Sequence, residues 1–262
     1  MTMIPEMPKL AVLDGDWIAY TAACWAENEG FDYLEGRIEY DLKNYTPKGC
    51  DAISLFSCSR NDNYRRDFWP VYKAHRDGKP SPQFLGDAIQ MMKDKSESRL
   101  VDTLEADDLI GLSVSAGIAM GVAIDKDMRT IPGWHWNPRK EDAPVYQSEA
   151  AAYRFFCKQL VMGDSTDGIY GMIGKGEAHF EKNIAILPED RWMDTIIQHY
   201  SDHFHKPGKR YVAKVDMIKN ELGITDPYDY FLTQARCIRL LQNGDYNGET
   251  KEIRLWTPEA TG

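Results

Sequence analysis

Acidic residues follow most of the short apolar segments in the first half of this 262-residue chain. These apolar segments, each a candidate β-strand, lie at residues 10–13, 53–56, 100–101 and 121–124. Stretches with helical spacing of apolar residues separate them, at residues 17–27, 82–93 and 106–116. This alternation is typical of a parallel sheet flanked by helices, in which the carboxyl ends of the strands share one edge. The sequence therefore predicts an α/β fold with a mostly parallel sheet and acids along one edge.

The second half of the chain changes to successive helices. They are expected at residues 149–162, 175–183, 189–203, 211–222 and 228–242, with a single strand at 252–256. The stretch 139–144 has the composition of a linker. We therefore expect two domains, an α/β domain over residues 1–147 and a helical region over residues 148–262.

Composition excludes several classes of protein. The longest uncharged segment, residues 109–124, is shorter than the ~20 apolar residues of a membrane-spanning helix. The residues before the first expected strand contain no charged-then-apolar leader, and five cysteines without CxxC spacing suit a reducing compartment. We therefore expect a cytoplasmic protein that spans no membrane.

Nine acids in four clusters stand at equivalent ends of successive elements: Asp14, Asp16, Glu105, Asp107, Asp108, Asp125, Asp127, Asp164 and Asp167. A single such cluster is explained by helix capping. Four clusters brought together would repel unless they held hard cations, and all-oxygen ligands suit Mg²⁺ or Mn²⁺. This favours a two-metal site for phosphoryl transfer. Without these nine acids the formal charge of −10 falls to about −1, so the acidic balance does not exclude DNA as a partner.

A basic segment between residues 60 and 79 carries cations among aromatic residues. Its cations include Arg60, Arg65, Arg66, Lys73 and Arg76. Aromatic rings can stack on bases while the cations contact phosphates, although a solvated loop explains the same pattern. Within YKAHR, Lys73 and Arg76 are placed to neutralise charge on a scissile phosphate.

Glycines are concentrated after GDSTDG, in the stretch GIYGMIGKGEAHF. Gly171, Gly174, Lys175 and Gly176 form a turn before a helix that can bind a phosphate backbone through amides, whereas the alternative is an ordinary turn. A Walker-type loop is excluded because Ile169 and Gly176 occupy positions that need Gly and Ser or Thr. The histidines at 199, 203 and 205 suggest zinc only weakly, because HExxH and a nearby cysteine are missing.

The ordered set VLDGDW, YKAHR, LEADDLIG, AIDKD, GDSTDG and GMIGKG resembles the 5'-nuclease (flap endonuclease) superfamily, above all the 5'-to-3' exonucleases of short-tailed bacteriophages. The resemblance runs from about residue 10 to residue 258, including the tail from 239. It implies a PIN-like or resolvase-like nuclease core, followed by a helix-three-turn-helix DNA-binding region. It also implies hydrolysis at 5' ends, nicks or flaps of DNA during phage replication or host DNA degradation, with RNA–DNA hybrids and RNA primers as further substrates.

The same resemblance implies residue roles. The nine acids match the metal cluster that holds two Mg²⁺ or Mn²⁺ ions, with Asp16 the weakest match. Lys73 and Arg76 match the residues that face the phosphate. The glycine turn matches a hairpin that holds duplex DNA and binds a monovalent cation through carbonyl oxygens. We expect a monomer that binds DNA, with Arg60, Arg65 and Arg66 among the contacts.

One departure from the family pattern lies after the second strand, where FSCSR puts Ser57, Cys58 and Ser59 in place of a further aspartate. Either Asp62 substitutes for it or the site works with fewer ligands. The short stretch after Arg76 favours an exonuclease over a strict flap enzyme.

Two alternatives to a nuclease stay open. VLDGDW also resembles the nucleophile motif of haloacid-dehalogenase-like phosphatases, and the missing aspartate is compatible with a DNA-junction binding protein that has lost catalysis.

Overall fold

The computed structural model describes residues 4–258, which form two compact units. The first unit contains residues 4–63, 78–149 and 240–253, and the second contains residues 64–77, 150–239 and 254–258. Each unit is thus assembled from separate stretches of the chain. The main division, after residue 149, lies close to the boundary expected between domains at 1–147 and 148–262, but the basic segment belongs to the second unit and most of the tail to the first.

Hydrogen bonds explain this exchange of segments. Arg65 in the basic segment donates to the carbonyl oxygens of Cys237 and Arg239, within the second unit. The backbone amide of Leu241 in the tail donates to the Asp108 carboxylate, within the first unit. These partners lie more than 100 residues apart in sequence, so no local pattern could indicate them.

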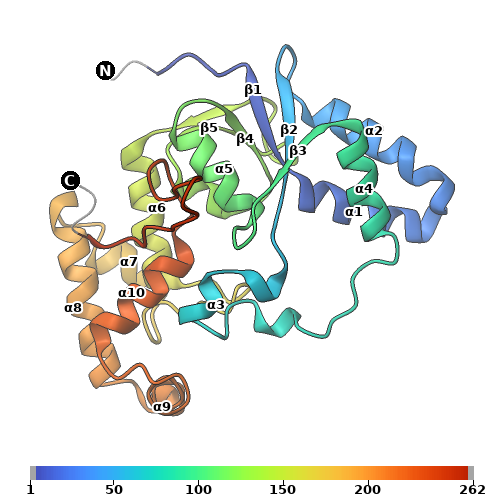
Figure 1. The fold of residues 1–262 in the computed structure, drawn as a ribbon. Coiled ribbons are helices and arrows are strands. Elements are labelled where there is room, and N and C mark those ends of the chain that lie inside the picture. The colour runs from blue at the N-terminus through green and yellow to red at the C-terminus, as the bar shows by residue number, and fades with distance from the viewer. Residues whose placement is uncertain (1–3, 259–262) are drawn as a thin grey trace. The chain divides into compact units, whose positions relative to one another are not determined.

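A six-stranded sheet forms the centre of the first unit, in the order β3-β2-β1-β4-β5-β6 (Figure 1). All neighbouring strands are parallel except β5 and β6, which are antiparallel. The strands are β1 (Leu10–Asp14), β2 (Asp51–Phe56), β3 (Glu97–Leu100), β4 (Met120–Val122), β5 (Gly133–Trp136) and β6 (Val145–Gln147). The mostly parallel sheet confirms the predicted fold class. Strands β5 and β6 were not predicted, because neither shows the continuous apolar run of a buried strand.

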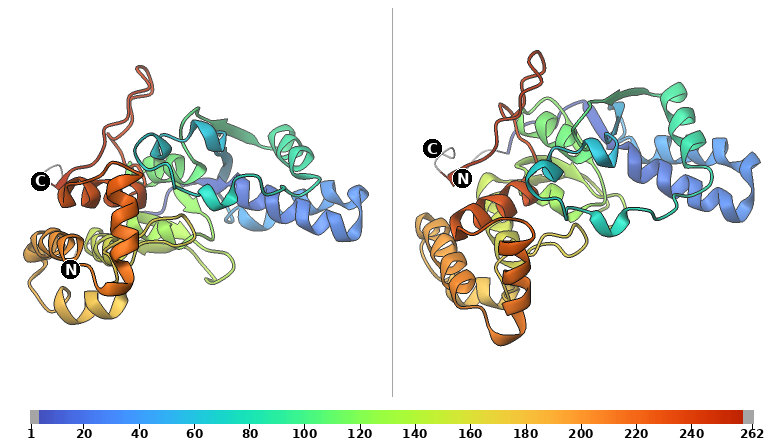
Figure 2. Two further views of the ribbon diagram at one scale, coloured as in Figure 1. Left: turned by 90° about the horizontal axis from the view of Figure 1, so that it is seen from below. Right: turned by 60° about the horizontal axis from the view of Figure 1, so that its bottom comes forward.

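Helices cover both faces of this sheet. They are α1 (Gly15–Glu29), α2 (Leu34–Tyr45), α4 (Leu85–Lys95) and α5 (Ala106–Ser115). Alternate β1 residues point to opposite faces, so Ala11 and Leu13 pack in the cluster that includes α1, α2 and α4. Helices α1, α2 and α4 contact one another (Figure 2), and α5 packs against β1 and β4. Helix α2 was not predicted, because only Leu34, Ile38 and Asp41 of its residues are buried.

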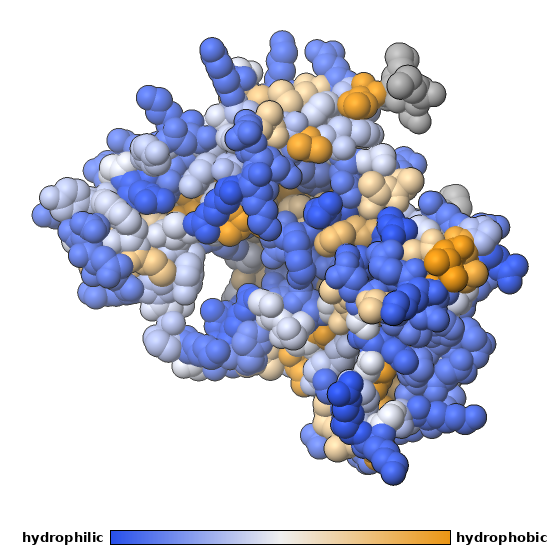
Figure 3. Space-filling view, turned by 180° about the vertical axis from the view of Figure 1, so that it is seen from behind, coloured by the Kyte–Doolittle hydropathy of each residue, from blue (hydrophilic) through white to orange (hydrophobic). Residues whose placement is uncertain are grey.

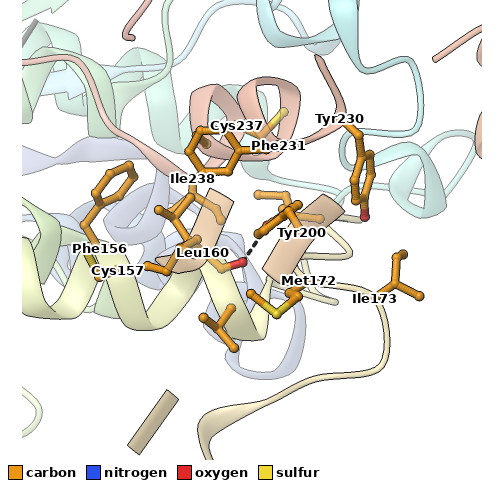
Figure 4. Close-up of a cluster of buried hydrophobic side chains, with 14 of the residues drawn as sticks. Phe156, Cys157, Leu160, Met172, Ile173, Tyr200, Tyr230, Phe231, Cys237 and Ile238 are labelled. Carbon is orange, nitrogen blue, oxygen red and sulfur yellow. Dashed lines mark hydrogen bonds between the residues drawn. The ribbon is translucent and has the colours of Figure 1, made fainter. Parts of the chain in front are cut away.

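The second unit is helical. Its helices are α3 (Arg65–Phe68), α6 (Glu149–Met162), α7 (Glu177–Asn183), α8 (Trp192–His205), α9 (Val212–Asn220) and α10 (Pro227–Ile238). Buried aromatic and aliphatic side chains fill its core, including Leu160, Phe231 and two fully buried tyrosines (Figure 4). The Tyr200 hydroxyl donates to the Leu160 carbonyl at 2.5 Å, drawn as the dashed line, and so is satisfied inside this core.

The predicted helices of this half are confirmed, with shifted ends. Helix α10 stops at Ile238 because Arg239 is extended, and the chain then leaves for the first unit. The strand predicted at 252–256 is wrong: within the described residues, only an isolated bridge joins Tyr246 and Ile253 there.

Polar residues cover most of the face seen in Figure 3, where hydrophobic residues form small separate groups. Among residues 4–258, no helix has the length and apolar character needed to cross a membrane.

Candidate active site

The carboxyl ends of β1 and β4 carry the central acids of the first unit. Asp14 ends β1 and is buried, and its Oδ1 accepts from the Trp17 amide at 3.0 Å, which caps α1. Asp125 follows β4 and is exposed, and its Oδ1 accepts from the Asp127 amide at 2.8 Å. Strands β2 and β3 lie on one side of β1 and β4 lies on the other, so these acids flank the point where the strand order reverses. Open α/β sheets bind their ligands at this point.

The conformation of β1 and α1 also depends on the glycine that follows Asp14. A Cβ added at Gly15 would lie 2.7 Å from the Leu55 carbonyl oxygen of β2 and 2.8 Å from the Phe56 ring. Only glycine lets the first turn of α1 approach β2 so closely. The glycine of the VLDGDW motif is therefore explained by packing.

The acids at the start of α5 have different surroundings. Glu105 and Asp108 form a capping box, in which Asp108 Oδ2 accepts from the Glu105 amide at 3.3 Å. Asp108 is fully buried, and its Oδ1 accepts from the Leu241 amide at 3.1 Å. Both oxygens of Asp108 thus accept from backbone amides, so this side chain also holds the start of α5 and the tail in place. Asp107 on the same turn is half-buried.

Ser57, directly after β2, is hydrogen-bonded to both α1 and α5. The Ser57 amide donates to Asp16 Oδ2 at 3.0 Å, and Ser57 Oγ accepts from the Ala106 amide at 2.9 Å. Asp16 therefore orients this junction.

Cys58, at the position where the resemblance predicts an aspartate, lies among acids. Burial raises the pKa of its thiol to about 11, with smaller contributions from the charges of Glu105, Asp108 and Asp62. Without a bound metal ion, the thiol therefore stays protonated at neutral pH.

In the second unit, GDSTDG forms a tight hairpin. The backbones of Asp164 and Ile169 exchange two hydrogen bonds, of 2.8 and 2.7 Å, and Asp164 Oδ1 accepts from the Thr166 amide at 2.8 Å. Asp164 is buried and Asp167 is half-buried. Asp164 thus stabilises the turn of the hairpin, whereas the helix-capping role that the sequence offered as the alternative is confirmed for Asp14 and Asp125 in the first unit.

The YKAHR segment attaches to this hairpin. Arg76 Nη2 lies 3.0 Å from Asp167 Oδ1, and Lys73 Nζ lies 3.5 Å from Asp167 Oδ2. The structure therefore brings together the two basic residues and one of the acids that the sequence singled out separately.

The three arginines predicted to contact DNA differ from one another. Arg60 is exposed. Arg65 is fully buried, donates to carbonyls at the end of α10 and lies over the ring of Tyr64, so the predicted DNA contact is corrected to a packing role. Arg66 forms a two-pronged ion pair with Asp77, at 3.1 and 2.8 Å.

Two residues of α10 that sequence reasoning missed hold the backbone of the glycine segment. Gln234 Oε1 accepts from the amides of Tyr170 and Gly171, at 2.8 and 3.1 Å, and the Tyr230 hydroxyl donates to the Gly171 carbonyl at 2.8 Å. Both side chains are fully buried in α10. The spacing of apolar residues indicated only a packed helix there, and no sequence signal distinguishes Gln234.

Gly174 and Gly176 differ in their surroundings. Gly174 has a φ of +72°, and a Cβ there would lie 2.4 Å from the ring of Tyr211. At Gly176, a Cβ would meet nothing within 4 Å. Lys175 between them is half-buried. Gly174 is therefore required by both backbone conformation and close packing, whereas Gly176 is not.

Histidines also lie close together in the second unit. His179 Nε2 lies 3.1 Å from His199 Nδ1, and the ring of His203 is 5.7 Å from that of His179. His205, the third of the histidines considered for zinc, is exposed.

The nine predicted acids are divided between the two units. Seven of them lie in the first unit, and Asp164 and Asp167 lie in the second. Within residues 4–258, no three His, Cys, Asp or Glu side chains are close enough together to hold one metal ion. By their chemistry these carboxylates fit Mg²⁺ or Mn²⁺, which prefer oxygen ligands, better than zinc.

Comparisons with known proteins point in one direction. No protein-family model matches the chain. An exonuclease of Escherichia phage T7 is 24% identical over 284 aligned positions, which cover 95% of this chain and 93% of the relative. An exodeoxyribonuclease of Enterobacteria phage T3 is 25% identical over 295 aligned positions, covering 96% and 93%.

Two solved structures share the fold. One is the T5 D15 protein co-crystallised with metal ions, with a TM-score of 0.50 and 16% identity over 87% of this chain and 90% of that one. The other is the catalytic core of Rad2 in complex with DNA substrate, with a TM-score of 0.51 and 13% identity over 97% and 85%. The phage exonucleases align with nearly the whole chain, which supports the resemblance to the 5'-nuclease (flap endonuclease) superfamily that the ordered motifs carry.

Proposed function

We propose that this protein is a metal-dependent exonuclease that hydrolyses the phosphodiester bonds of DNA in the 5'-to-3' direction. The names of its phage relatives, an exonuclease and an exodeoxyribonuclease, support a nuclease. The observation that carries the proposal is the position of Asp14 and Asp125, which flank the crossover point at the carboxyl ends of the parallel β1 and β4. The name of the T3 relative, an exodeoxyribonuclease, supports DNA as the substrate.

The metal ligands that we propose are the acids other than Asp16, Asp108 and Asp167: Asp14, Glu105, Asp107, Asp125, Asp127 and Asp164. Two Mg²⁺ or Mn²⁺ ions bound there would activate a water molecule and stabilise the departing 3' oxygen. Asp16 and Asp108 hold backbone amides around the site. Cys58 stands where the family pattern has an aspartate, so this ligand set has one carboxylate fewer than that pattern.

The phosphate and the duplex are bound by other residues. Lys73 and Arg76 supply positive charge to the scissile phosphate as negative charge develops on it. The hairpin with Gly171, Gly174, Lys175 and Gly176 holds the uncleaved duplex through its backbone, where carbonyl oxygens also bind a monovalent cation. We place the protein in the cytoplasm of an infected bacterium as a monomer, acting at 5' ends, nicks or flaps of DNA and on RNA–DNA hybrids.

The test is a time course on linear duplex DNA labelled at either the 5' or the 3' end, with Mg²⁺ or with chelator. We expect early release of short 5'-labelled products only with Mg²⁺. Asp125→Ala and Asp164→Ala should abolish cleavage while DNA binding is largely kept. Asp142→Ala is the matched control, because it removes an equally small acid from an exposed loop. Full activity of Asp125→Ala or Asp164→Ala would reject the proposed site.

The same assay addresses the two alternatives. The phage relatives do not favour a phosphatase, and hydrolysis of small phosphate monoesters without DNA cleavage would be needed to revive it. A junction binding protein without catalysis would bind branched DNA equally with Mg²⁺ or chelator and cut it under neither condition.

A further inference from the structure

Asp167 is the point at which the basic YKAHR segment and the acidic GDSTDG hairpin are joined. Its Oδ1 accepts from Arg76 Nη2 at 3.0 Å, and its Oδ2 lies 3.5 Å from both Lys73 Nζ and the Tyr72 hydroxyl. Its side chain is only 14% exposed, so solvent screens these ion pairs less than those at an open surface. One carboxylate therefore holds both cations that the proposed reaction directs to a phosphate.

The backbones of the two segments are joined as well. The Lys73 amide donates to the Asp167 carbonyl at 2.8 Å, and Trp69 Nε1 donates to the Gly168 carbonyl at 3.0 Å. A Cβ at Gly168 would lie 2.5 Å from the Val71 carbonyl oxygen, so the hairpin can approach the segment this closely only with glycine there. The hairpin thus serves as the platform on which the basic segment rests.

Lys73 also has a strained backbone. Its φ of 51° lies in the left-handed region, which non-glycine residues seldom adopt. Such strain persists only where the surrounding contacts enforce it, and here the bond from the Lys73 amide to Asp167 is one such contact. Asp167, which the Lys73 ammonium group faces, therefore also holds the Lys73 backbone in the conformation that places this side chain.

We infer that Asp167 is the positioning residue of the two cations: it holds Lys73 and Arg76 as their counter-ion in the DNA-free protein, and a DNA phosphate takes them over on binding. The inference rests on the proposed function only in naming DNA as the ligand that displaces the carboxylate. It assigns Asp167 a role distinct from metal ligation. DNA must compete with Asp167, so the carboxylate weakens metal-free binding while it keeps both cations in place.

A double-mutant cycle in chelator tests this competition. The affinity for a short duplex with a 5' end is measured for the wild type, Asp167→Asn, Lys73→Met/Arg76→Met and the triple variant. In the wild-type background Asp167→Asn should increase the affinity for DNA about 3-fold to 10-fold, because DNA no longer has to replace two partly exposed ion pairs. It should also steepen the salt dependence, because each additional phosphate that the protein neutralises adds about 0.9 to the slope.

In the Lys73→Met/Arg76→Met background, Asp167→Asn should change affinity by less than about 2-fold, since only general repulsion of DNA by the carboxylate is then removed. Equal tightening in both backgrounds, or none in the wild type, overturns the inference. Asp167→Glu keeps the charge and should behave like the wild type.

A second measurement needs no DNA. In chelator, trypsin should cleave after Lys73 and Arg76 faster in Asp167→Asn than in the wild type or Asp167→Glu, because the segment loses its anchor. Cleavage after Lys140, which is exposed in the first unit, is the internal control and should not change. Unchanged cleavage after Lys73 and Arg76 contradicts the anchoring role. A wild type that never cuts DNA with Mg²⁺ rejects the proposed function alone, because both tests of Asp167 are made without metal.

Discussion

Arg65 and Arg66 are neighbours of the same residue type, and the structure predicts that replacing them has very different consequences. Arg65 is fully buried, and its guanidinium donates to the carbonyls of Cys237 and Arg239 at 3.2 and 3.3 Å. Cys237 lies in the last turn of α10 and Arg239 is its C-cap residue, at the end where a helix leaves acceptors without intrahelical partners and carries partial negative charge. Arg65 therefore supplies both hydrogen bonds and charge to this helix end.

The magnitude follows from these contacts. Each hydrogen bond from a charged donor contributes about 1.5 to 3 kcal/mol to the free energy of unfolding, so the two together contribute about 3 to 6 kcal/mol. Methionine keeps the length of the apolar stem and removes the cost of burying a charge, which returns part of this loss. We expect Arg65→Met to lower the free energy of unfolding by about 3 kcal/mol, which corresponds to a fall of about 6 to 12 °C in Tm for a chain of this size.

Arg66→Met is the matched control. Arg66 pairs with Asp77, whose side chain is 48% exposed, and such surface pairs contribute about 0 to 1 kcal/mol. Thermal and denaturant unfolding, followed by circular dichroism, compares the two variants with the wild type. Equal melting temperatures for both variants, together with a loss of DNA affinity in Arg65→Met alone, would refute the structural role and restore the DNA contact that the sequence suggested.

Three further predictions concern the glycine hairpin, the histidines and Cys58. Gly174→Ala places a methyl group against the Tyr211 ring at a φ of +72°, so we expect its affinity for duplex DNA, measured by fluorescence anisotropy, to fall at least 10-fold. The affinity of Gly176→Ala should stay within about 2-fold of the wild type. Equal effects of the two substitutions would contradict the packing argument. Burial, and to a smaller extent the charge of Lys175, lowers the pKa of His179 to about 4 from its ordinary 6.5. As the pH falls, the unfolded chain therefore takes up this proton before the folded protein does. The contribution of neutral His179 to stability is complete above pH 6.5 and is lost as the pH falls toward 4. His179→Gln should therefore flatten the dependence of Tm on pH between 6.5 and 4, and an unchanged slope would reject this assignment. Cys58→Asp puts a carboxylate beside Glu105 and Asp108. The added carboxylate should lower the Mg²⁺ concentration needed for half-maximal cleavage several-fold, and its repulsion of the other two should reduce stability in chelator. Cys58→Ser should change neither quantity.

Much of the first unit could be predicted because its signals are local. The apolar runs of β1 and β2 and the acids that end β1 and follow β4 are adjacent in sequence, and a parallel sheet brings the corresponding ends together for any chain with this pattern. Helix α2 was not predicted because its buried face is narrow and most of its other residues are polar. Strands β5 and β6 were not predicted because three or four half-exposed residues carry too weak a pattern of apolar residues.

The sequence by itself determined the fold class, the order of the acidic and basic motifs and the resemblance to the superfamily, because these depend on periodicity and on the order of residues along the chain. Only the tertiary structure decided what individual side chains do. It turned Arg65 inward, brought the Leu241 amide to Asp108 Oδ1 and placed Lys73 and Arg76 beside Asp167. The physical reason is that each of these roles depends on a partner 90 or more residues away, or on burial created by packing, and neither leaves a mark in the neighbouring sequence.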